Sequence, residues 1–154
     1  MLNRSPVFLA ALLLLAFSFG ARAENASAED EVKKVADTLF RAINDGNMEM
    51  VIGTYHRDSV YLSKNHPAAR GIEEIKKAYQ DTFGRVKFKV DHVIQQVFAD
   101  TSIAILESNA SGTITIQETL KTVPVDVKEL FVFRKIENRW KIDRYMFNDN
   151  VQGR

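Results

Sequence analysis

The sequence predicts an α+β domain in which three N-terminal helices pack on a curved, mainly antiparallel sheet. Apolar residues recur at helical spacing before Gly84 and alternate at every second position after it. Residues 131–147 form two alternating segments that flank Glu137 and Asn138, which is typical of a hairpin with a tight turn. Helices followed by consecutive strands favour an arrangement in which the helices cover one side of the sheet.

Three helices are expected before the sheet. The first begins at about residue 31 and ends at Gly46, because glycine favours a helix end. Asn47 can cap a second, shorter helix, and Gly71 opens the third. Their apolar faces are Val32, Val35, Ala36, Leu39, Phe40 and Ile43 in the first, Met48, Val51, Ile52 and Tyr55 in the second, and Ile72, Ile75, Tyr79 and Phe83 in the third.

Five strands are predicted from the alternating segments. A short strand at residues 59–63 follows the second helix, and residues 65–70 are expected to form a loop. After the third helix, long antiparallel strands are expected at residues 86–98, 102–116, 123–136 and 139–147. Such strands bury one face against the helices and leave the other face outward.

The closing hairpin also predicts a binding surface. Its register would pair Phe133 with Ile142, Phe131 with Arg144 and Glu129 with Met146. A concave, mostly apolar face with a few polar groups is typical of small-molecule pockets. The predicted pocket residues are Tyr55, Tyr61, Phe83, Glu129, Phe131, Arg144, Met146 and Asn148.

Each pocket residue also has a structural interpretation. Glu129 and Arg144 would be candidates for catalysis or ligand binding, or they would form a buried ion pair within the fold. The aromatic residues at these spacings could equally be core residues.

Residues 1–23 are predicted to be a signal peptide. Arg4 precedes an apolar run at residues 7–19, and Ala21 and Ala23 occupy the positions that a signal peptidase recognises. The run is shorter than the roughly 20 residues that span a bilayer, so we expect cleavage after Ala23 and export to the periplasm or the outside of the cell.

The remaining chain would consist of a flexible lead-in at residues 24–30 and one domain at residues 31–150. The chain carries 21 Lys and Arg and 20 Asp and Glu, and removal of Arg4 and Arg22 would leave a net charge of −1. This balance gives no electrostatic footprint for nucleic acid or an anionic membrane, so neither is expected as a partner. The sequence contains no cysteine, which leaves no disulfide or thiol chemistry.

No cofactor or metal is expected. His56, His66 and His92 have no metal-like spacing, and the sequence contains neither a phosphate-binding glycine loop nor a nucleophile elbow. His66 is the histidine expected nearest the mouth of the pocket, in a loop beside Pro67.

Four segments resemble the nuclear transport factor 2-like superfamily, the cone-shaped fold shared by ketosteroid isomerases and SnoaL-type polyketide cyclases. The similarity is greatest to its small bacterial SgcJ/EcaC and DUF4440-type branch. The matching segments are residues 42–47, 55–61, 70–75 and 140–142. The resemblance implies a cone with an internal pocket and a homodimer through the open face of the sheet.

The resemblance also implies positions for catalytic residues. Ketosteroid isomerases carry a carboxylate base near the end of the first strand and a tyrosine in the first helix. Ser63 and Leu39 occupy these positions here, and neither side chain can do that chemistry.

Three functions therefore stay open. The first is an exported binding or accessory domain with an apolar pocket for a small apolar or amphipathic molecule. The second is an isomerase, cyclase or dehydratase that uses Glu129 and Arg144. The third is a structural dimerisation module with a filled cone. A void inside the cone would favour the first two.

Overall fold

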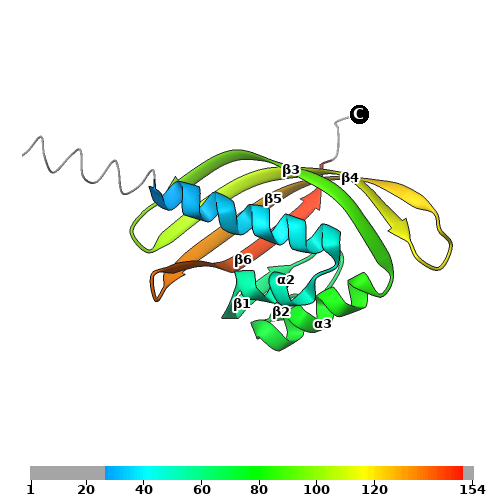
Figure 1. Cartoon of the computed structure of the whole chain (residues 1–154), viewed down its shortest axis with the longest axis horizontal. Helices are drawn as coiled ribbons and strands as arrows, with labels where there is room; N and C mark the ends of the chain where they lie inside the picture. Colours follow the sequence, from blue (N-terminus) through cyan, green and yellow to red (C-terminus); the bar gives the residue numbers. More distant parts are fainter. Residues whose placement is uncertain (1–26, 151–154) are drawn as a thin grey trace, which may run out of the picture.

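The computed structural model describes residues 27–150 (Figure 1). The predicted signal peptide, residues 1–23, lies outside the described residues. The first helix spans residues 27–45, so the expectation of a flexible lead-in up to residue 30 is wrong for residues 27–30. Ala28 is the reason, because its side chain is buried in the core and extends the apolar face of the helix by one turn.

The elements that follow confirm the α+β class. They are α2 (Met48–Thr54), β1 (Tyr55–Leu62), β2 (Ala69–Arg70), α3 (Gly71–Phe83), β3 (Val86–Ala99), β4 (Ile103–Ile116), β5 (Thr122–Ile136) and β6 (Arg139–Asp149). The six strands form one sheet in the order β2-β1-β6-β5-β4-β3, in which only β1 and β6 are parallel. Figure 1 shows the helices gathered on one side of this strongly curved sheet.

The first strand is longer than predicted. Tyr55 was expected on the apolar face of the second helix, but it ends α2 in an extended conformation and begins β1. Tyr55 is buried. A buried tyrosine suits both the last turn of an apolar helix face and the start of a strand. The spacing of apolar residues alone therefore did not distinguish a helical from an extended Tyr55. Part of the predicted loop, Ala69–Arg70, forms β2 as an edge strand beside β1.

The tight turn of the closing hairpin is confirmed. Glu137 and Asn138 both have positive φ, at 48° and 59°, as a two-residue hairpin turn requires. Phe133 lies opposite Ile142, as predicted.

The register beyond Phe133 differs from the prediction by one residue. A β-bulge lies between Val132 and Phe133, so Val132 pairs with Arg144 and Asp143 is the extra residue. Phe131 therefore faces Tyr145, and Glu129 faces Phe147. A one-residue shift moves every following side chain to the other face of the sheet.

Asn44 fixes the first helix to the edge of the sheet. Its amide nitrogen donates to the carbonyl oxygen of Val90 at 2.7 Å, and the Val90 N–H donates to the amide oxygen at 2.9 Å. Val90 lies on the edge strand β3, where these backbone groups have no neighbouring strand. The Asn44 side chain thus replaces the missing strand at this point.

Replacing Asn44 by alanine should lower the free energy of unfolding by about 1–2 kcal/mol, because two hydrogen bonds to the backbone are lost. The exposed neighbour Asp45 provides the control, since Asp45→Ala should change stability by less than about 0.5 kcal/mol. Urea unfolding of both variants measures the difference. Equal stabilities would show that the contact with Val90 contributes nothing.

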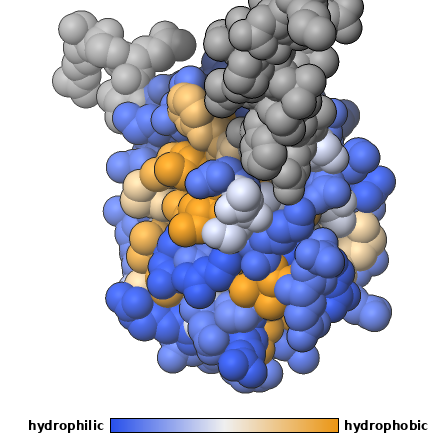
Figure 2. Space-filling view, turned by 90° about the vertical axis from the view of Figure 1, so that its left-hand side faces the viewer, coloured by the Kyte–Doolittle hydropathy of each residue, from blue (hydrophilic) through white to orange (hydrophobic). Residues whose placement is uncertain are grey.

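Part of the surface is apolar. Large exposed hydrophobic side chains include those of Phe98, Ile103 and Ile105. Two of them flank the β3–β4 turn, at the end of the molecule seen in Figure 2, where hydrophobic residues interrupt a largely hydrophilic surface. Within residues 27–150, no helix has the length and hydropathy needed to cross a membrane.

Candidate functional site

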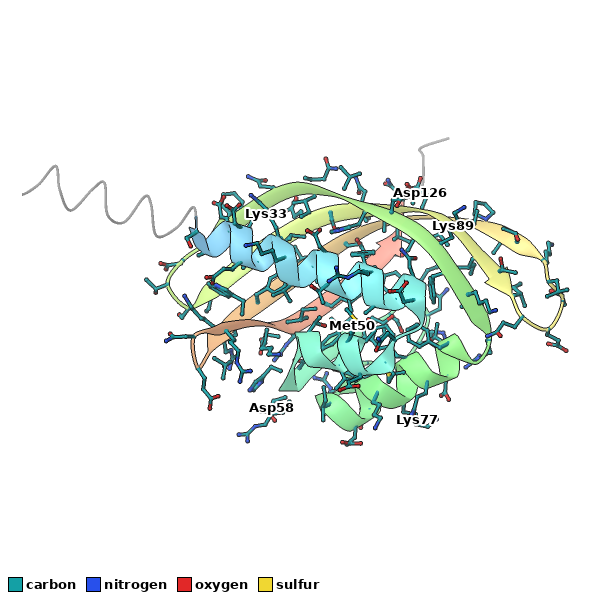
Figure 3. The ribbon with its side chains drawn as sticks, viewed as in Figure 1. Lys33, Met50, Asp58, Lys77, Lys89 and Asp126 are labelled. Carbon is teal, nitrogen blue, oxygen red and sulfur yellow. The ribbon has the colours of Figure 1, made fainter. Side chains whose placement is uncertain are left out.

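An open cavity of about 1040 Å³ lies between the helices and the concave face of the sheet. Its lining comes from the first helix, the loop between β1 and β2, α3, and the inner faces of β3 to β6. Lys77 of α3 and Asp126 of β5, both labelled in Figure 3, mark the helical and the sheet side of the cavity. Most of the exposed lining is apolar.

A buried carboxylate lies in the wall of this cavity. Glu129 of β5 is only 6% exposed and accepts two hydrogen bonds, one at each oxygen. The Tyr145 hydroxyl donates to Oε1 at 2.5 Å, and the Ser108 hydroxyl donates to Oε2 at 2.8 Å. The register explains the arrangement, because Ser108 lies directly opposite Glu129 and the bulge turns Tyr145 of β6 to the same face.

Burial raises the pKa of Glu129 above its ordinary value, and the hydrogen bonds from Tyr145 and Ser108 lower it part of the way back. Among residues 27–150, none of the salt bridges includes Glu129. The group is therefore a buried acid without a cationic partner, and its raised pKa favours the protonated form more than in a free glutamate.

Four aromatic residues of the cavity wall lie next to this acid, and three of them stack. The ring of Tyr61 lies between those of Tyr79 and Tyr145, at centroid distances of 5.1 and 5.5 Å. Phe147 lies tilted at 5.8 Å from Tyr145. Burial raises the pKa of each of the three tyrosines, so their hydroxyl groups stay protonated and the side chains stay neutral.

Charged residues surround the mouth of the cavity in pairs. Lys64 forms an ion pair with Asp149, and Lys77 forms one with Asp81 at 2.8 Å. The Arg85 side chain donates to the carbonyl oxygen of Asp81 at 3.0 Å. His66 lies in the lining of the cavity, in the loop where it was expected.

The predicted pocket residues divide into three groups. Tyr61 and Glu129 line the cavity. Tyr55 and Phe131 are buried in the core instead, with exposures of 4% and 0%. Phe83 packs against Tyr79 without lining the cavity. For these three aromatic residues the core interpretation holds.

The sequence-based prediction placed the third group on the wrong face of the sheet. Arg144, Met146 and Asn148 project from the outer face of the sheet, because the bulge at Asp143 shifts them by one residue. The guanidinium of Arg144 contacts the Asp143 carboxylate at 3.0 Å, so the predicted pair with Glu129 does not form. Met146 and Asn148 line a smaller hollow of about 620 Å³.

Three site residues were missed in the sequence. Tyr145 and Phe147 were missed because the bulge is not visible in the alternation of β6. Ser108 could have been found, since it continues the inward series Ala104, Leu106 and Ala110 on β4.

The positions implied by the ketosteroid isomerases carry neither of the expected catalytic groups. Leu39 is fully buried in the core, whereas Ser63 lines the cavity just after the end of β1. Ser63 supplies no carboxylate base, and Leu39 supplies no oxyanion donor. No group of three or more His, Cys, Asp or Glu side chains within residues 27–150 is arranged to hold a metal ion.

The fold and the cavity agree with the sequence relationship. The model of the SnoaL-like domain family matches residues 36–141, so the chain belongs to this family, within the nuclear transport factor 2-like superfamily. The finer assignment to the SgcJ/EcaC and DUF4440-type branch stays a prediction. No curated protein sequence matches the chain significantly.

Solved structures with the same fold include a ketosteroid isomerase-like protein from Erwinia carotovora atroseptica, with 28% sequence identity and a TM-score of 0.76. The match covers 80% of this chain and 97% of that one. A nuclear transport factor 2-like superfamily protein from Salmonella enterica serovar Typhimurium has 14% identity and a TM-score of 0.74, over 82% of this chain and 94% of that one. The second likeness shows the fold alone.

Replacing Tyr145 by phenylalanine should raise the pKa of Glu129 further, because it removes a hydrogen bond that stabilises the carboxylate. Tyr79→Phe is the matched control, since the Tyr79 hydroxyl bonds to Tyr55 instead. Carbon-13 NMR titration of the Glu129 carboxyl group measures both variants. An unchanged titration in Tyr145→Phe would remove Tyr145 from the site.

Glu129 should also make stability depend on pH. Its pKa is higher in the folded than in the unfolded chain, so its contribution to stability is present at low pH and is lost as the pH rises through the folded pKa. Glu129→Gln should abolish this loss. Urea unfolding of both proteins across this pH range tests it, and parallel curves would contradict it.

Proposed function

We propose that this chain is an exported domain that binds a small, largely apolar molecule in its cavity, with a polar group of the ligand at Glu129. The main supporting observation is the buried carboxylate of Glu129 in the wall of an open, mostly apolar cavity of about 1040 Å³. Small-molecule sites usually combine such an apolar wall with a few convergent polar groups. A cavity of this size also argues against a structural module with a filled cone.

An enzyme of the isomerase, cyclase or dehydratase kind is the second candidate. The raised pKa of Glu129 favours it, because a general acid or base works best with a pKa near the working pH. Tyr145 would position this carboxylate. Arg144 has no part in this candidate mechanism, because its side chain lies on the other face.

Native mass spectrometry of the protein purified from its own host tests the binding function. A bound small molecule is expected, and its mass would show the chemical class. Ala78→Phe places a bulky ring in the cavity wall and should abolish the bound mass. Lys76→Phe, at an exposed position of the same helix, should retain it. Equal occupancy in both variants would place the ligand elsewhere.

Export and dimerisation belong to the same proposal. The leader pattern supports a mature chain that starts at Glu24, and N-terminal sequencing of the native protein would establish this; an intact Met1 form would contradict it. The exposed side chains of Ile105 and Met146 on the outer face support a homodimer through the sheet. Analytical ultracentrifugation of Ile105→Glu should show more monomer than the unchanged protein.

A further inference from the structure

The wall of the cavity combines a buried carboxylate with several aromatic side chains. Glu129 is 6% exposed and lines the cavity, and both of its oxygens accept hydrogen bonds from hydroxyl groups. These neutral donors stabilise a carboxylate but do not balance its charge. Burying a charge without a partner is costly and raises the pKa of Glu129, so the charged form has an unfilled requirement for a positive group.

No cation of the described chain fills this requirement. Within residues 27–150, no lysine, arginine or histidine forms a salt bridge with Glu129. The cations in the cavity lining are engaged at its mouth, Lys64 with Asp149 and Lys77 with Asp81. Arg85 donates to a backbone carbonyl.

The aromatic residues beside Glu129 suit a positive ligand. Tyr61 stacks with Tyr79 and Tyr145 at centroid distances of 5.1 and 5.5 Å, Phe147 lies tilted at 5.8 Å from Tyr145, and all four line the cavity. The face of an aromatic ring attracts a cation, most strongly where water is excluded. The same surroundings disfavour an anion, because its charge would meet Glu129 without a compensating donor.

We infer that the cavity selects an organic cation, namely an amine or quaternary ammonium group carried on an apolar body. The positive group lies at Glu129 and beside the ring of Phe147, which is paired with Glu129 across the sheet, and the apolar body fills the space toward Ala110 and Val127. This inference rests on the proposed binding function and adds the charge of the ligand to it.

Three probes with one skeleton test the charge preference: phenylbutylamine, phenylbutanol and phenylbutyrate. Isothermal titration calorimetry at neutral pH should show that the amine binds at least about tenfold more tightly than the alcohol, and that the acid binds most weakly. Glu129→Gln should reduce the affinity for the amine far more than the affinity for the alcohol, so that the preference for the amine is lost. Glu107→Gln, at an exposed position on the outer face of β4, should keep the full preference.

A second variant covers the possibility that Glu129→Gln does not fold. Phe147→Leu keeps the wall apolar and removes one ring, so it should reduce the affinity for the amine more than the affinity for the alcohol. Equal affinities of amine and alcohol in the unchanged protein, or tightest binding of the acid, would overturn the inference and leave the binding function intact. Absence of binding by all three probes would overturn the binding function as well.

Discussion

Replacing Gly112 by alanine should destabilise the domain by at least about 3 kcal/mol. Gly112 lies in β4 between Val90 and Val125, with φ at +148°, a region that L-residues rarely adopt. An added Cβ would lie 2.9 Å from the Cα of Val90 and closer still to the backbone of Lys89. The backbone of β3 at Lys89 and Val90 cannot move away without breaking its pairing with β4. The steric clash and the backbone strain at residue 112 therefore both lower the stability of the variant.

Gly53→Ala is the matched control for this substitution. Gly53 lies inside α2, and nothing lies within 4 Å of the position of its added Cβ. Alanine favours a helix over glycine, so stability should rise by about 0.5–1 kcal/mol. Thermal and urea unfolding of both variants check the contrast. A stable Gly112→Ala protein would show that the close approach of β3 to β4 at this position does not require glycine.

Trp140→Ala should cost about 3–5 kcal/mol, because truncation of a large buried aromatic residue leaves a cavity in the core. Trp140 is only 4% exposed, and Lys135 of the paired strand lies over its ring at 5.6 Å. The substitution removes both the apolar contacts and the cation–π contact.

Phe98→Ala is the control for the loss of an aromatic ring. Phe98 lies on the edge strand β3 and is 58% exposed, so its truncation should change stability by less than about 1 kcal/mol. Urea unfolding with a two-state fit gives both values. Similar losses in the two variants would contradict the placement of Trp140 in the core.

Periodicity predicted most of the fold. The change from helical spacing to alternation after Gly84 located the four long strands to within one or two residues. The prediction failed at Tyr55, whose side chain is buried whether the backbone is helical or extended. It also failed at residues 27–30, where polar and small residues concealed the first turn of a helix.

The site was harder to predict because it depends on register. Alternation identified Glu129 as an inward residue, but the same alternation placed Arg144 beside it. Asp143, the extra residue of the bulge, forms ion pairs with Arg134 and Arg144, and a pattern of apolar residues encodes neither the bulge nor these pairs. Because of this one extra residue, Glu129 contacts Tyr145 instead of its predicted partner Arg144.

NMR mapping of a bound probe tests the central claim most directly, namely that the cavity of the concave face is a ligand site with Glu129 in its wall. Phenylbutylamine is titrated into protein labelled at its methyl groups. We predict that the shifts gather at the inward methyl groups of Ala110, Val125 and Val127, and that the Glu129 carboxyl resonance moves with them. Shifts confined to Val93, Ile105 and Met146 on the outer face, or a Glu129 resonance that does not move, would contradict the claim.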